Sequence, residues 1–167
     1  MKFWPMGLLA TLASAAAAIS APAQAQGVLK DKRGNWETRC QTPTGALREQ
    51  CEVVQGVVAQ DRPRVALTAI ALNAADGKSR ILRILAPIGV LIPAGLGMKI
   101  DGEDFGRIGF TRCLPNECIA EAEIDDKLLN KLKSGATATL VLFMTPEEGV
   151  GVPLPLAGFK ESYESLP

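Results

Sequence analysis

Four cysteines constrain the fold of this 167-residue chain more than any other feature. Ten residues separate Cys40 from Cys51, and four residues separate Cys113 from Cys118. Both intervals contain turn-forming residues such as proline, and local pairing therefore predicts the disulfides Cys40–Cys51 and Cys113–Cys118. A zinc site made from all four cysteines is the alternative, but it would prefer two closely spaced pairs, and the first interval is too long for one.

The first 25 residues have the features of a secretory signal peptide, and export favours disulfide formation. Lys2 supplies a positive charge, residues 6–19 are apolar, and Ala23-Gln24-Ala25 fits a cleavage site. We expect cleavage after residue 25, which leaves a single mature domain of residues 26–167. The apolar stretch is shorter than the roughly 20 residues of a spanning helix. We therefore expect a cleaved signal and no transmembrane segment after cleavage.

Composition argues against several classes of function. The chain has 18 basic and 18 acidic residues. Because Lys2 is the only charged residue of the leader, the mature domain has 17 basic and 18 acidic residues, a net charge of −1. This balance argues against nucleic-acid binding. There is no histidine, which removes the commonest general base and the commonest transition-metal ligand. We expect no enzyme activity and no cofactor.

Short segments rich in aliphatic and β-branched residues predict a mainly β domain. Asp76-Gly77 predicts the turn of a hairpin, and a helix is expected from Asp125 or Asp126 to Gly135. A second short helix is expected over residues 158–166. Many short strands separated by turns are typical of a β-sandwich. The expected strands are residues 35–40, 50–58, 64–73, 81–85, 98–101, 107–112, 119–124, 137–145 and 150–156.

Two acidic runs are the remaining candidates for catalysis. A carboxylate pair could hydrolyse a glycosidic bond. The side chains available for it are Asp101, Glu103 and Asp104 in one run, and Glu147 and Glu148 in the other. We interpret both runs as solvated turns. A calcium site in the first run lacks the alternating ligand spacing of known calcium loops.

Two features are candidates for binding a partner. The first is an apolar segment, residues 87–97, whose side chains would form an adhesive patch if exposed and would close one end of the sandwich if buried. The second is Trp36, for which a core position is the alternative, since aromatic residues make up only 5% of the chain. The candidate partner-binding residues are Trp36, Val90, Leu91 and Ile92.

Three motifs, together with the cysteines, resemble those of a known family. Gly34-Asn35-Trp36 precedes the first cysteine, the sequence PIGVLIPAG follows at residues 87–95, and Leu156-Ala157-Gly158-Phe159 comes near the end. In this order and spacing, from residue 34 to residue 166, they resemble the invasion-associated locus B family of exported bacterial proteins. Asn35 stands where the family usually has Asp, and Pro155 where Ser is common.

The resemblance implies an immunoglobulin-like β-sandwich with one or two short helices, stapled by disulfides. It also implies a periplasmic or outer-surface location in a Gram-negative bacterium. It brings no catalytic residues. We therefore expect a non-enzymatic protein that binds an unknown protein partner in the envelope or on a host surface. A structural or stress-related periplasmic role is one alternative, and a carboxylate-based envelope hydrolase is another.

Overall fold

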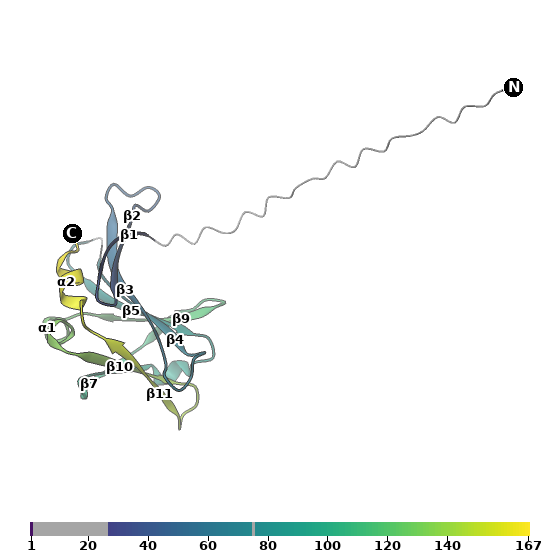
Figure 1. Cartoon of the computed structure of the whole chain (residues 1–167). Helices are drawn as coiled ribbons and strands as arrows, with labels where there is room; N and C mark the ends of the chain where they lie inside the picture. Colours follow the sequence, from purple (N-terminus) through teal and green to yellow (C-terminus); the bar gives the residue numbers. More distant parts are fainter. Residues whose placement is uncertain (2–26, 75) are drawn as a thin grey trace.

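Two antiparallel sheets pack face to face in the computed structural model, which describes Met1 and residues 27–74 and 76–167 (Figure 1). The larger sheet has the order β1 (Val28–Arg33), β2 (Trp36–Gln41), β3 (Gln50–Val58), β4 (Ala66–Asn73), β5 (Arg80–Pro87), β9 (Glu117–Glu123) and β8 (Phe110–Cys113). The smaller sheet has the order β11 (Gly149–Pro155), β10 (Thr137–Phe143), β6 (Leu96–Ile100) and β7 (Glu103–Ile108). The expected signal peptide lies outside the described residues, apart from Met1.

Period-two burial places the core between the sheets. In β10, Ala138, Leu140 and Leu142 are fully buried while the residues between them are half-buried. In β5, Leu82 and Ile84 are likewise buried and alternate with half-buried residues. Successive side chains of a strand face opposite sides of a sheet, so this alternation gives each strand one core face. The mainly β, two-sheet fold class expected from the sequence is confirmed.

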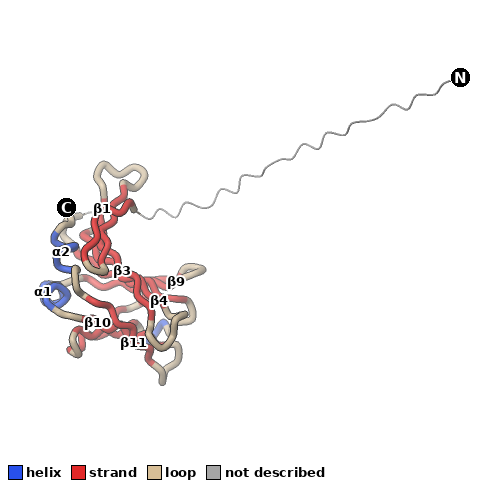
Figure 2. Tube along the Cα trace, in the orientation of Figure 1, coloured by secondary structure: helices blue, strands red, loops and turns tan. Residues whose placement is uncertain are grey.

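Both expected helices form, α1 (Asp126–Ser134) and α2 (Phe159–Glu164). The Asp125 carboxylate accepts a hydrogen bond from the Leu128 N–H at 2.7 Å and so caps α1, as expected. Figure 2 shows the two helices next to each other on one side of the molecule, where they are in contact. Among the described residues, the helices are too short to cross a membrane.

The β4–β5 hairpin is confirmed. The Asp76 carboxylate accepts hydrogen bonds from the Lys78 and Ser79 N–H groups, and Gly77 has a φ of +67°. These contacts form the turn that the Asp-Gly pair predicts.

The structure differs from the sequence prediction in two places. Strand β1 was not expected, because its sequence VLKDKR is exposed on both faces and lacks an apolar alternation. The strand expected at residues 107–112 is wrong: it spans the end of β7 and most of β8, which belong to different sheets. The chain crosses between the sheets at Gly109, a change of partner that a local pattern does not encode.

The two ends of the described domain interlock at a pair of glycines. Gly34, in the β1–β2 turn, has a φ of +58°, and a Cβ there would lie 2.5 Å from the Ala157 carbonyl oxygen. Gly158 has a φ of +90°, and a Cβ there would overlap the Arg33 carbonyl oxygen. Next to them Trp36 is fully buried. Its indole N–H donates to the Pro155 carbonyl at 3.1 Å.

An aromatic contact completes this interlock. The rings of Trp36 and Phe159 meet edge to face, with centroids 4.9 Å apart. We call Gly34, Trp36, Pro155, Gly158 and Phe159 the terminal clasp. It joins the first and last motifs of the family resemblance, so the presence of both motifs in one chain has a structural reason: both glycines are needed where two backbones touch.

We predict that Gly158→Ala destabilises the domain by more than about 3 kcal/mol, because a Cβ would add a backbone clash to the left-handed strain. Gly89→Ala is the matched control: Gly89 has a φ of +88°, and nothing lies within 4 Å of the position that a Cβ would take there. The control should lose only about 1–2 kcal/mol. Urea unfolding of both variants measures the difference, and equal losses would contradict the clasp.

Candidate functional site

Exposed apolar side chains gather at the end of the larger sheet where β5 stops and β9 starts. Pro87 pairs with Glu117 across these strands, and the Leu114 N–H donates to the Glu117 carbonyl at 2.7 Å. Ile88 follows directly after β5 and is 57% exposed, and Leu114 is 44% exposed. Ile92, also 44% exposed, lies in the same β5–β6 connection. We call Ile88, Ile92 and Leu114 the end surface.

The β5–β6 connection is held to the smaller sheet rather than left free. The Leu91 N–H donates to the Phe143 carbonyl at the end of β10, at 2.7 Å. The Arg107 guanidinium donates to the Ala94 carbonyl at 2.6 Å and lies 5.0 Å from the centre of the Phe143 ring. These contacts fix the short 3-10 turn η1 (Ile92–Ala94). The loop therefore presents its exposed side chains from a rigid support, as binding loops commonly do.

The predicted binding residues separate into two groups. Trp36 is 0% exposed and Val90 is 8% exposed, so both belong to the core, which is the alternative that the sequence left open for each of them. Leu91 is half-buried, and only Ile92 is exposed. Ile88 lies within the predicted segment 87–97 but was not among the residues named for binding, and sequence reasoning missed Leu114. Gly89 after Ile88 and Pro115 after Leu114 mark turns, where an apolar residue has no strand face to occupy.

Asp101 of the first acidic run has a structural role. Its carboxylate accepts hydrogen bonds from the N–H groups of Thr137, at 2.9 Å, and Ala136, at 3.0 Å. These bonds tie the β6–β7 turn to the start of β10. The same two N–H groups, that of Thr137 first, lower the pKa of Asp101, because they stabilise its charged form. A φ of +49° completes the turn.

The carboxylates of the other acidic candidates are ion-paired, hydrogen-bonded or singly exposed. Glu103 forms ion pairs with Lys131, at 2.7 Å, and Lys127, at 3.4 Å, and these lysines lower its pKa. The Asp104 carboxylate accepts the Gly106 N–H at 2.6 Å. In the second run, Glu148 pairs with Arg62 and Glu147 is exposed. Neither run therefore presents a pair of unoccupied carboxylates in a cleft. The second run is a solvated turn, whereas in the first only Asp101 lies in a turn, and Glu103 and Asp104 begin strand β7.

We predict that Asp101 makes the fold sensitive to acid. Because its pKa is lowered in the folded state, its stabilising effect is present above its ordinary value of 3.8 and is lost as the pH falls through the lowered pKa. Asp101→Asn should lower stability at neutral pH and flatten the pH dependence below 3.8. Unfolding midpoints over about pH 2–6 test this. Asp61→Asn, at an exposed loop position, is the control.

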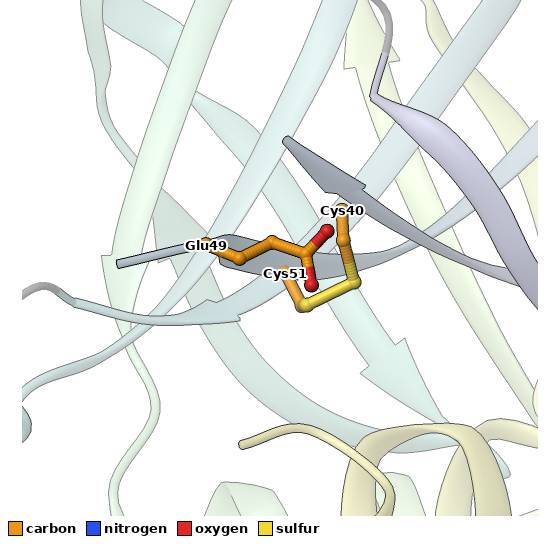
Figure 3. Close-up of side chains that lie close together, drawn as sticks. All are labelled: Cys40, Glu49 and Cys51. Atoms are coloured by element: carbon orange, nitrogen blue, oxygen red, sulfur yellow. A yellow bond between two sulfur atoms is a disulfide. The ribbon is translucent and has the colours of Figure 1, made fainter. Parts of the chain in front are cut away.

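The four cysteines form two local disulfides, Cys40–Cys51 and Cys113–Cys118. Each disulfide joins directly opposed residues of neighbouring strands. Figure 3 shows the Glu49 carboxylate beside the first disulfide. One of its oxygens and the two sulfurs all lie within 4.8 Å of one another. Because both sulfurs are in a disulfide, neither offers the thiolate that zinc requires. The zinc alternative is thus not supported by the way the cysteines are arranged.

An open hollow of about 860 Å³ lies along β2, β3 and β11. Glu37 and Glu52 both line it, and they share one face because Glu37 is opposite Val54 and Arg39 is opposite Glu52. Burial raises the pKa of Glu52. Hydrogen bonds from Arg39 and Lys32 lower the pKa of Glu37. The hollow thus contains two carboxyl groups with opposite pKa shifts, which sequence reasoning did not single out.

Fold and site together define a class: a disulfide-bridged β-sandwich with an exposed apolar end and a hollow that holds two carboxyl groups. The model of the family described as "Invasion associated locus B (IalB) protein" matches residues 36–167. The chain belongs to this family, as its motifs indicated.

Known relatives carry related names. Invasion protein B homologues of two Brucella abortus strains, 2308 and biovar 1 strain 9-941, are each 28% identical to this chain over 139 residues. The match covers 83% of this chain and 79% of each relative. The crystal structure of invasion associated protein b from Bartonella henselae superposes with a TM-score of 0.67 at 20% identity. It covers 82% of this chain and 94% of that one, and it supports the fold.

Proposed function

We propose that this protein is a non-enzymatic binding module of the bacterial cell envelope, which contacts a protein partner through the end surface. The observation that carries the proposal is the exposure of Ile88, Ile92 and Leu114, the first two of which lie in the anchored β5–β6 connection. Burying such side chains against a partner releases about 25 cal/mol per Å² of apolar area. The names of the Brucella and Bartonella relatives support a role in host-cell interaction or invasion.

Aspartate substitutions test the end surface. Ile92→Asp and Leu114→Asp should each weaken binding of the purified domain to cultured host cells by about tenfold or more, equivalent to about 1.4 kcal/mol, because a charge would be desolvated at the contact. Melting temperatures should stay close to that of the wild type, since both side chains are exposed. Binding of the fluorescently labelled domain, measured across a concentration series, gives the affinity.

Leu47→Asp is the matched control for this experiment. Leu47 is an exposed leucine like Leu114, more fully exposed than it, and lies in the β2–β3 loop at the opposite end of the larger sheet. It should bind like the wild type. Equal binding by all variants would contradict the end surface as the site. Failure of the wild type to bind host cells or outer-membrane vesicles would contradict the binding function itself.

The location we propose is the periplasm or the outer surface, reached through a cleaved signal peptide. Protease treatment of intact cells distinguishes the two, with a known periplasmic protein as the internal control. Cleavage of the mature domain while the control survives would favour a host or surface partner. Protection until the outer membrane is opened would favour an envelope partner. In the second case a structural or stress-related role, tested by the detergent sensitivity of a deletion strain, gains weight.

A carboxylate-based hydrolase is a second candidate, and the hollow is the observation that favours it. Glu37 and Glu52 are diagonal neighbours on one sheet face, a relation that places residues about 7–8 Å apart and within reach of long side chains. Inverting glycosidases separate their two carboxyl groups by about 6.5–9.5 Å and give the acid the higher pKa. Turnover of envelope glycans that disappears in Glu52→Gln, but not in Asp104→Asn, would establish this activity. No turnover by the wild type would exclude it on those substrates.

A further inference from the structure

The two disulfides differ in their exposure to a reductant. Cys113 is an exposed residue at the end of the edge strand β8, and its partner Cys118 is 3% exposed. The other disulfide lies within the sheet, between β2 and β3, where Cys40 is 4% exposed and Cys51 is half-buried. Thiol–disulfide exchange requires a thiolate to approach one sulfur along the disulfide bond, so access decides which bond reacts.

We propose that Cys113–Cys118 is a redox-exchange site. A dithiol reductant attacks the Sγ atom of Cys113 and opens this disulfide, which joins β8 to β9, while the domain stays folded. Attack joins one sulfur of the reductant to Cys113 and breaks the Cys113–Cys118 bond. Cys118 leaves as a thiolate and takes up a proton. The second thiol of the reductant then attacks its own sulfur in this mixed disulfide and releases Cys113, which is also protonated.

Atoms, electrons and protons balance in this exchange. The protein gains two electrons and two protons, and the dithiol ends as a disulfide. The exposed member of the pair is the one attacked, and the buried member is the leaving group, so the direction of the reaction follows from the burial of the two residues.

The hairpin has other contacts that keep it closed after reduction. The Leu114 N–H donates to the Glu117 carbonyl at 2.7 Å, and the Thr111 hydroxyl donates to the Ile119 carbonyl at 3.1 Å. The cysteines are only five positions apart, and a short loop gains less stability from cross-linking than a long one. Among the strands that the structure describes, β8 pairs only with β9. Reduction therefore loosens one edge of the larger sheet and leaves the core between the sheets in place.

The surroundings of Cys40–Cys51 disfavour the same attack. The Glu49 carboxylate lies beside both sulfurs and would repel an incoming thiolate (Figure 3). Glu49 also forms an ion pair with Lys30 at 2.9 Å, which keeps the carboxylate close to β1. Burial therefore leaves Cys113–Cys118 as the more reactive bond, and the Glu49 carboxylate, whose charge Lys30 partly offsets, adds to the difference.

Leu114 lies inside the ring that Cys113–Cys118 closes, so opening the bond would also remove a covalent restraint on one member of the end surface. This consequence rests on the proposed function, whereas the exchange reaction does not. The two proposals are tested separately, because the exchange is measured by alkylation of the cysteines and the function is measured by binding.

The test is a graded reduction of the purified mature domain with dithiothreitol, followed by alkylation and peptide mass spectrometry. We expect Cys113 and Cys118 to be alkylated at least about tenfold faster than Cys40 and Cys51, since attack depends on access. Circular dichroism of the half-reduced protein should match that of the oxidised protein. Simultaneous reduction of both bonds, earlier reduction of Cys40–Cys51, or unfolding on opening of the first bond would overturn the proposal.

Two variants separate the causes. The double variant Cys113→Ser and Cys118→Ser should fold and keep a cooperative melting transition. Loss of that transition would contradict the claim that the domain folds without this disulfide. Glu49→Gln should speed reduction of Cys40–Cys51 and leave Cys113–Cys118 unchanged. An unchanged rate at Cys40–Cys51 would contradict protection by the carboxylate and assign the difference between the two bonds to burial.

Discussion

The close approach of two glycines at the terminal clasp is the constraint on which the arrangement of the two sheets depends. Gly34 and Gly158 let the β1–β2 turn touch the backbone between β11 and α2. This contact brings Trp36 onto Phe159 and under the carbonyl of Pro155. One side chain thereby links the larger sheet, the smaller sheet and the C-terminal helix. The buried tryptophan is thus a structural residue, and the clasp explains why motifs so far apart in the chain occur together.

Charged and polar groups mostly serve the turns and the sheet surface. Asp76 forms the β4–β5 turn, Asp101 joins a turn to β10, and Asp125 caps α1. On the outer face of the larger sheet, Arg83 and Glu121 pair across β5 and β9 at 2.6 Å. Ion pairs that stay in contact with solvent on a sheet surface add little stability. What these groups leave for function is a small set: the hollow beside β3 and the apolar end surface.

The end surface and the exposed disulfide lie next to each other, and this gives the proposed function and the redox inference a common location. Leu114 belongs to the surface, and its neighbour Cys113 belongs to the disulfide. The rest of the surface is attached to β10 and β7 through Leu91 and Arg107. One part of the surface is therefore held by a bond that can be opened chemically, and the other part by hydrogen bonds within the sandwich.

Sequence by itself determined the features that depend on neighbours along the chain. The β4–β5 turn, both helices, the alternating core strands and the local pairing of the cysteines are of this kind, because local chemistry specifies each of them. Tertiary structure decided which apolar residues are exposed. Val90 and Ile92 are equally apolar and two residues apart, yet one enters the core and the other faces solvent. Burial depends on which strands pack over a loop. The position of Glu37 and Glu52 in one hollow likewise depends on the pairing of β2 with β3.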